Sequence, residues 1–130
     1  MTSNTAALAA LFAAASLASP STSDAGTTVE VHVRGVAGPL APRALGRALP
    51  ARRFIDCQRT FMGGSVWLTL RVSPEGALRV ESARTSGEEV SPFVPCVRRV
   101  IRAINVGAQR AESVARVEVR FPALGVAPTR

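Results

Sequence analysis

The amino-acid sequence predicts an α+β fold, a two-layer β-α-β-β-α-β arrangement with two helices packed on one face of a small sheet. Three observations support this prediction. Four segments alternate between apolar and polar residues, as half-buried strands do, and two others carry apolar residues at helical spacing. Glycine, proline and polar residues separate the segments. Each segment has one apolar face, which must be buried against another layer.

The first expected strand covers residues 28–36. Val29, Val31 and Val33 share one face, and the polar residues between them share the other. Residues 37–49 are rich in glycine and proline, so we expect an irregular connection holding a turn of helix at most.

The first expected helix covers residues 50–62. Pro50 suits a first helical position, and the Gly63-Gly64 pair ends the element. We expect the apolar side of this helix to face the core; it consists of Phe54, Ile55, Cys57, Phe61 and Met62.

A hairpin is expected next, with strands at 65–72 and 77–85 around a turn at 73–76. The turn sequence Ser-Pro-Glu-Gly has proline and glycine where tight turns favour them. In the first of these strands, the residues that face away from the helices are expected to be Trp67, Thr69 and Arg71.

Residues 86–91 are expected to form a polar loop, and a second helix is expected at 91–105. Its apolar positions follow helical spacing throughout; they are Phe93, Cys96, Val97, Val100, Ile101 and Ile104. A last strand is expected at 115–121, and Pro122 ends it.

The two cysteines lie on the apolar faces of the two expected helices. Cys57 and Cys96 therefore approach one another if the helices are neighbours, and we expect a disulfide between them. The alternative is a pair of buried reduced thiols. The 39-residue spacing does not resemble the Cys-x-x-Cys pattern of redox proteins.

The start of the chain resembles a secretory leader. An apolar run at 6–18 is followed by small residues that suit a signal peptidase, so residues 1–25 are expected to be a cleaved signal peptide that leaves no stable membrane anchor. The folded domain is then 28–122 and the tail 123–130. We expect a periplasmic or secreted protein.

All sixteen basic residues are arginine, and the formal net charge is +7. The simplest explanation is the composition bias of a GC-rich genome. The functional alternative is contact with acidic partners, since the arginine fork binds carboxylates and phosphates.

Several of these segments resemble a known family. They are the helix-borne Cys57, the hairpin from Val66 to Leu78, Cys96-Val97 with the basic and apolar residues after them, and the closing stretch from Val117 to Pro122. In order and spacing they resemble the C-terminal domain of TonB-type envelope proteins, and more closely the AgmX/PglI C-terminal domain of myxobacterial envelope and gliding proteins.

The resemblance implies a non-catalytic periplasmic adaptor that binds a partner peptide by strand addition at a sheet edge. The last strand is the expected edge, with partner-binding residues Arg116, Val117, Glu118, Val119 and Arg120. Trp67 and Arg71 on the open sheet face are further candidates. The expected partner is an envelope protein or an outer-membrane protein segment, and the same edge offers a route to a homodimer.

Three other functions fit the residues less well. The arginines of the two helices suit nucleic acid or another polyanion. No nucleic-acid-binding motif appears in the sequence, however, and we do not expect the protein to bind nucleic acid. The element order also occurs in acylphosphatases, for which Arg34 would hold phosphate; Pro39 and Pro42 remove backbone donors that such a loop needs. His32 has no evident nucleophile to serve. We therefore expect no enzyme activity, metal or cofactor.

Overall fold

The computed structural model describes residues 28–124. The expected leader lies outside these residues, as does the tail beyond residue 124. Four strands form one sheet, and two α-helices and two 3-10 helices connect them. In chain order the elements are β3 (Glu30–Ala37), α2 (Pro42–Ala48), η3 (Ala51–Cys57), β4 (Gly64–Val72), β5 (Leu78–Thr85), η4 (Glu88–Phe93), α3 (Val94–Arg102) and β6 (Ser113–Phe121).

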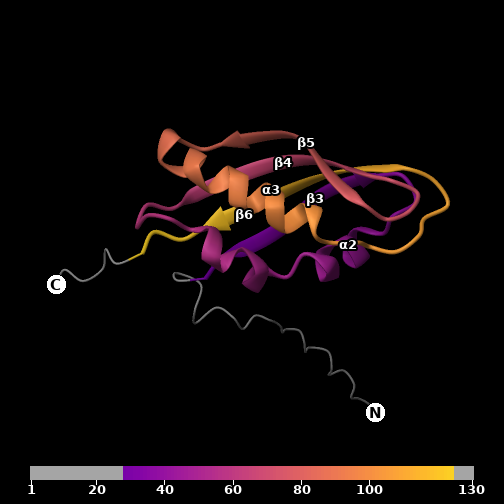
Figure 1. Ribbon diagram of the computed structural model, residues 1–130, viewed down its shortest axis with the longest axis horizontal. Helices are drawn as coiled ribbons and strands as arrows, with labels where there is room; N and C mark the ends of the chain where they lie inside the picture. Colours follow the sequence, from indigo (N-terminus) through magenta and orange to yellow (C-terminus); the bar gives the residue numbers. More distant parts are fainter. Residues whose placement is uncertain (1–27, 125–130) are drawn as a thin grey trace, which may run out of the picture.

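The sheet has the order β3-β6-β4-β5, and every neighbouring pair is antiparallel. Strand β6 lies in the interior, paired with β3 on one side and with β4 on the other. The helices cover one face of this sheet (Figure 1). The α+β class and the helix-on-sheet layering are thus confirmed.

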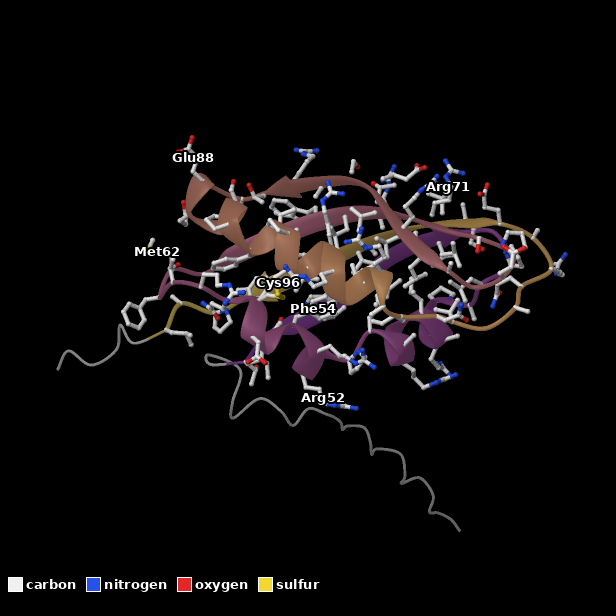
Figure 2. The ribbon with its side chains drawn as sticks, in the orientation of Figure 1. Arg52, Phe54, Met62, Arg71, Glu88 and Cys96 are labelled. Atoms are coloured by element: carbon white, nitrogen blue, oxygen red, sulfur yellow. A yellow bond between two sulfur atoms is a disulfide. The ribbon has the colours of Figure 1, made fainter. Side chains whose placement is uncertain are left out.

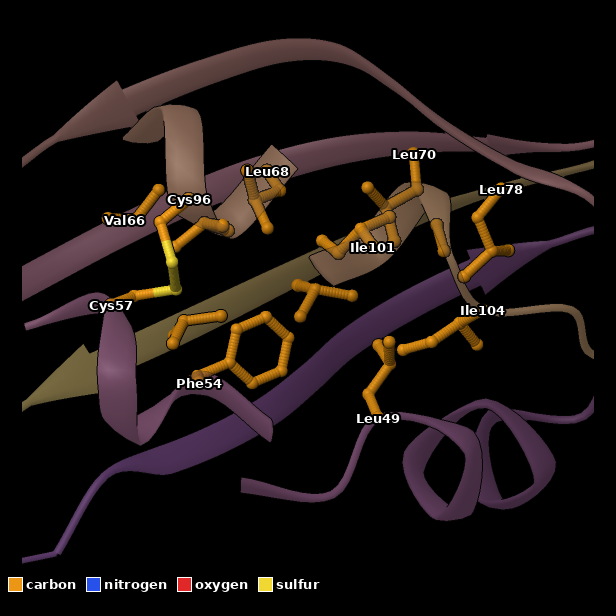
Figure 3. Packing of buried hydrophobic residues seen from close by; sticks show 14 of the residues in the cluster. Leu49, Phe54, Cys57, Val66, Leu68, Leu70, Leu78, Cys96, Ile101 and Ile104 are labelled. Atoms are coloured by element: carbon orange, nitrogen blue, oxygen red, sulfur yellow. A yellow bond between two sulfur atoms is a disulfide. The ribbon is translucent and has the colours of Figure 1, made fainter. Parts of the chain in front are cut away.

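The core lies between the sheet and the helices. Leu45 of α2, Phe54 of η3 and Ile101 of α3 are all fully buried and belong to one apolar cluster with the sheet. Figure 3 shows Phe54 and Ile101 on the side of the sheet to which Leu68 and Leu70 of β4 point. Because three successive helices share one core with the sheet, the described part of the chain is held together as one packed unit.

The hairpin of β4 and β5 is confirmed. The amide of Gly76 donates to the carbonyl of Ser73 at 2.8 Å, which closes the expected turn. Gly76 has a φ of +92°, and a Cβ at this position would lie 2.4 Å from the carbonyl oxygen of Gly107. Glycine is therefore required here both by the backbone conformation and by the close approach of the loop that precedes β6.

The expected helix at 50–62 is wrong in type and length. A 3-10 helix spans Ala51–Cys57 instead, and it buries Phe54 and Cys57, which are three residues apart. A 3-10 helix has three residues per turn, so this spacing keeps both on the core side and turns Ile55 outward. Ile55 is 55% exposed, and beyond the helix Phe61 and Met62 are 72% and 54% exposed.

The other helical segments differ from expectation in their bounds. The connection at 37–49 contains a full α-helix, α2, which starts at Pro42 and buries Leu45. The loop expected at 86–91 is largely taken up by η4, and α3 runs only over Val94–Arg102. The apolar positions of the expected second helix nevertheless face the core, since each is buried except the half-buried Val100.

Candidate functional site

The disulfide joins two elements of the helical layer, η3 and α3. Cys57 ends η3 and Cys96 lies in the first turn of α3, with their Cα atoms 5.4 Å apart and an S–S distance of 2.09 Å. Figure 3 shows the bond over the sheet beside Val66. The expected pairing is confirmed, and neither cysteine of the described residues is free. Both are buried, so the bond is placed to stabilise the fold.

The expectation that the last strand is a sheet edge is wrong. Arg116, Val117, Glu118, Val119 and Arg120 all pair with β3 and with β4, so their backbone groups already have partners within the sheet. Val117 and Val119 are also buried against the helices. The alternation in the sequence indicates which face of β6 is buried. Interior and edge strands share this pattern, so it could not show that β6 is an interior strand.

Glu118 anchors the face of the sheet that the helices leave open. It is 4% exposed, accepts hydrogen bonds from Arg34 Nε at 3.2 Å and from the Ser65 hydroxyl at 2.7 Å, and also pairs with Arg120. Burial alone would raise the pKa of this carboxyl. The hydrogen bonds from Arg34, Ser65 and Arg120 outweigh burial and lower the pKa to about 2.

Arg34 and Arg120 belong to a charge-balanced cluster. Arg120 also lies 3.6 Å from Glu30, and Glu30 Oε1 lies 2.8 Å from His32 Nε2. Two guanidiniums therefore face two carboxylates. Because Arg34 is bound to Glu118, its guanidinium is engaged within the sheet instead of presented to a phosphate as an acylphosphatase would need.

A second balanced cluster surrounds Arg71. Its guanidinium pairs with Glu81 of β5 and, at 2.8 Å, with Glu112; Arg79 adds a contact to Glu81 at 3.4 Å. A hydrogen bond from Arg71 outweighs burial and lowers the pKa of Glu81, and the same contact raises the pKa of Arg71. Figure 2 places Arg71 at the opposite end of the molecule from Met62. Arg71 thus remains a candidate contact whose charge is already neutralised.

Trp67 lies between these clusters and lines a hollow of about 500 Å³ on the open face. The indole is 41% exposed. Trp67 pairs with Arg84 of β5, and Thr69, the next residue of β4 on this face, pairs with Arg116 of β6 and with Ser82 of β5. Within residues 28–124, neither Arg84 nor Arg116 forms an ion pair. Their two positive charges are therefore uncompensated.

The outer strands of the sheet are β3 and β5. On β5, the Ser86 amide donates to the Ser65 carbonyl at 3.0 Å, just beyond the strand end. Amide direction alternates along an antiparallel strand, so the amides of Ser82 and Arg84 point to β4 and those of Ala83 and Thr85 point outward. A second depression, of about 230 Å³, lies on the helix side of this strand and is lined by Arg79, Val80, Arg98 and Arg102.

Sequence reasoning did not single out Arg84 or the outer side of β5. Arg84 follows the alternation of its strand like any solvated residue, and only the register shows that it faces Trp67. The sequence did point to the basic side of the second helix. In the structure, Arg98 and Arg102 of this side lie beside Val80 of β5.

Neither a metal-binding cluster nor a membrane-spanning helix is found in the described part of the chain. It contains no group of three histidine, cysteine or carboxylate residues placed to hold a metal ion. None of the helices in residues 28–124 has the length and apolarity that crossing a bilayer requires.

No protein-family model matches this chain, and no curated protein or solved structure matches it either.

Proposed function

We propose that this protein is a non-catalytic interaction module of the bacterial envelope that binds an extended, acidic segment of a partner protein along the outer side of β5. The mode of binding is strand addition, as the resemblance to TonB-type and AgmX/PglI C-terminal domains implies. The added strand would pair with β5 instead of β6. The observation that carries the proposal is the position of β5, which is an outer strand with the depression formed by Val80, Arg98 and Arg102 beside it.

The charges beside β5 favour an acidic partner. Arg98 and Arg102 are exposed on α3, and neither forms an ion pair within residues 28–124. A strand added to β5 would place alternate side chains over this basic depression, where carboxylates would gain charge-assisted contacts.

The disulfide supports placement outside the cytosol, because oxidising compartments are where such bonds persist. Periplasmic or secreted localisation is therefore part of the proposal.

The test uses a ten-residue peptide of alternating glutamate and threonine, with a lysine–threonine peptide as the charge control. We expect the acidic peptide to bind and to slow hydrogen exchange at the amides of Ala83 and Thr85, and the lysine peptide to have no effect. Slowed exchange on β3 with none on β5 would contradict binding at β5 and place the site on β3. An absence of any slowing would contradict strand addition altogether.

A matched pair of variants isolates the backbone contact. Ala83→Pro removes an outward amide and leaves the β4–β5 ladder intact, which edge strands tolerate. Ala83→Ser retains the amide at nearly the same volume. We expect the proline variant to lose peptide binding and the serine variant to keep it. Equal binding by both, with the circular dichroism of the wild type retained, would contradict the proposal.

A further inference from the structure

We propose that the hollow around Trp67 is a binding site for a carboxylate-bearing polysaccharide, in which one sugar ring lies on the indole and the carboxylates of two uronate units pair with Arg84 and Arg116. This site lies on the open face of the sheet and does not depend on strand addition at β5. Its lining includes the open-face residues Arg34, Trp67, Thr69, Ser82, Arg84 and Arg116.

The charge of the hollow comes from two residues alone. Arg34 and Arg120 are balanced by Glu30 and Glu118, and Arg71 and Arg79 are balanced by Glu81 and Glu112. Arg84 and Arg116 have no carboxylate among the described residues. A ligand with negative charge would satisfy them without displacing any existing ion pair, and planar carboxylates match the arginine fork.

The two arginines are placed to hold one extended ligand. Arg84 lies on β5 opposite Trp67, and Arg116 lies on β6 opposite Thr69. Two strand spacings and a two-residue offset separate their Cα atoms by roughly 12 Å. Trp67 and Thr69 are consecutive open-face residues of β4, the strand between β5 and β6, so a ligand that joins the two guanidiniums must cross β4 beside the indole.

The remaining chemistry of the hollow favours a sugar over a peptide. The backbone groups of β4 are engaged in ladders with β5 and β6, so this face offers side-chain groups only. These are the guanidiniums of Arg84 and Arg116, that of Arg34 already bound to Glu118, the hydroxyls of Thr69 and Ser82, and the face of the indole. A uronate ring presents the matching set of a carboxylate, several hydroxyls and an apolar C–H face. The hollow, at about 500 Å³, falls within the range of small-ligand sites.

The experiment follows Trp67 fluorescence, since this is the only tryptophan in the chain. The full chain is titrated with a short oligogalacturonate, and with a neutral malto-oligosaccharide, poly-glutamate and duplex DNA as comparison ligands. We expect a saturable change in fluorescence with oligogalacturonate and little with the others. No response to oligogalacturonate would overturn the proposal. An equal response to poly-glutamate or to DNA would also overturn it, because the hollow would then be a general polyanion-binding surface.

Two double variants separate the site from general positive charge. R84Q/R116Q removes two charges from the hollow, and R98Q/R102Q removes two from the helical layer. Losing two charge-assisted contacts should weaken oligogalacturonate binding roughly tenfold or more in the first variant, with little change in the second. Equal weakening in both would overturn the proposal. Ala83→Pro should leave oligogalacturonate binding unchanged, so failure here and failure of strand addition are distinguishable.

Discussion

The Ser65 hydroxyl donates to Glu118 Oε2 at 2.7 Å, which links β4 to β6 through a carboxylate that is 4% exposed. This contact lies on the face that the helices leave open, near the end of the sheet where β4 begins and β6 ends. With Arg34 and Arg120, it holds a negative charge among positive groups on a central strand. Stability and the electrostatics of the open face therefore depend on the same side chain.

The first prediction concerns pH. The pKa of Glu118 is lowered to about 2 in the folded protein, so the unfolded chain binds more protons in the acid range. The stabilisation is complete above the unfolded pKa of about 4.5 and is lost as pH falls towards 2. At neutral pH, Glu118→Gln should lower the free energy of unfolding by up to about 3 kcal/mol, and the difference should vanish near pH 2. Urea unfolding at several pH values measures this. Glu88→Gln is the control, because Glu88 is exposed and forms no ion pair within residues 28–124. A pH profile unchanged by Glu118→Gln would contradict the assignment.

The second prediction concerns the disulfide. Its cysteines are 39 residues apart, and the chain-entropy model gives a stabilisation of roughly 4 kcal/mol for a loop of this size. The double variant Cys57→Ser/Cys96→Ser should lose about this much in chemical denaturation. Mass spectrometry of the unreduced wild type after alkylation should find neither thiol modified. Full alkylation of both cysteines in native protein would show that the bond is not formed in solution.

The third prediction compares two glycines with similar backbone conformation. Gly76 and Gly107 have φ values of +92° and +90°, but only at Gly76 would a Cβ meet neighbouring atoms. Gly107→Ala should cost roughly 1–2 kcal/mol from left-handed strain alone. Gly76→Ala should cost clearly more, because a Cβ there would lie 2.4 Å from a backbone oxygen. Thermal unfolding of both variants is the measurement, and equal losses would show that the contact relaxes freely.

The fourth prediction concerns two adjacent residues of η3. Phe54 is fully buried and Ile55 is 55% exposed. Phe54→Ala should destabilise the protein by about 3–5 kcal/mol, whereas Ile55→Ala should stay within about 0.5 kcal/mol of the wild type. Denaturant midpoints compare the two. A large loss from Ile55→Ala would favour the α-helical spacing that the sequence predicts over the 3-10 helix.

Local sequence patterns predicted the structure correctly where they reflect the burial of one face or a specific backbone angle. The alternation in β4 and β6, the turn closed by Gly76 and the apolar spacing of α3 could all be predicted, because each reflects burial of one face or a specific backbone angle. The pairing of Cys57 with Cys96 could be predicted because both lie on apolar positions. The helix at 50–62 could not, since its apolar residues also fit a 3-10 turn followed by an exposed loop.

Residue patterns were enough to predict which residues of each strand face the core, where the hairpin turns and that the two cysteines are joined. The folded arrangement was needed to see that β6 lies between β3 and β4, that β5 is an outer strand, and that Arg84 and Arg116 lie opposite Trp67 and Thr69 without carboxylate partners. The reason is physical. Side-chain periodicity encodes which face of a strand is buried, but strand order is set by backbone hydrogen bonds, whose donors and acceptors are the same at nearly every residue.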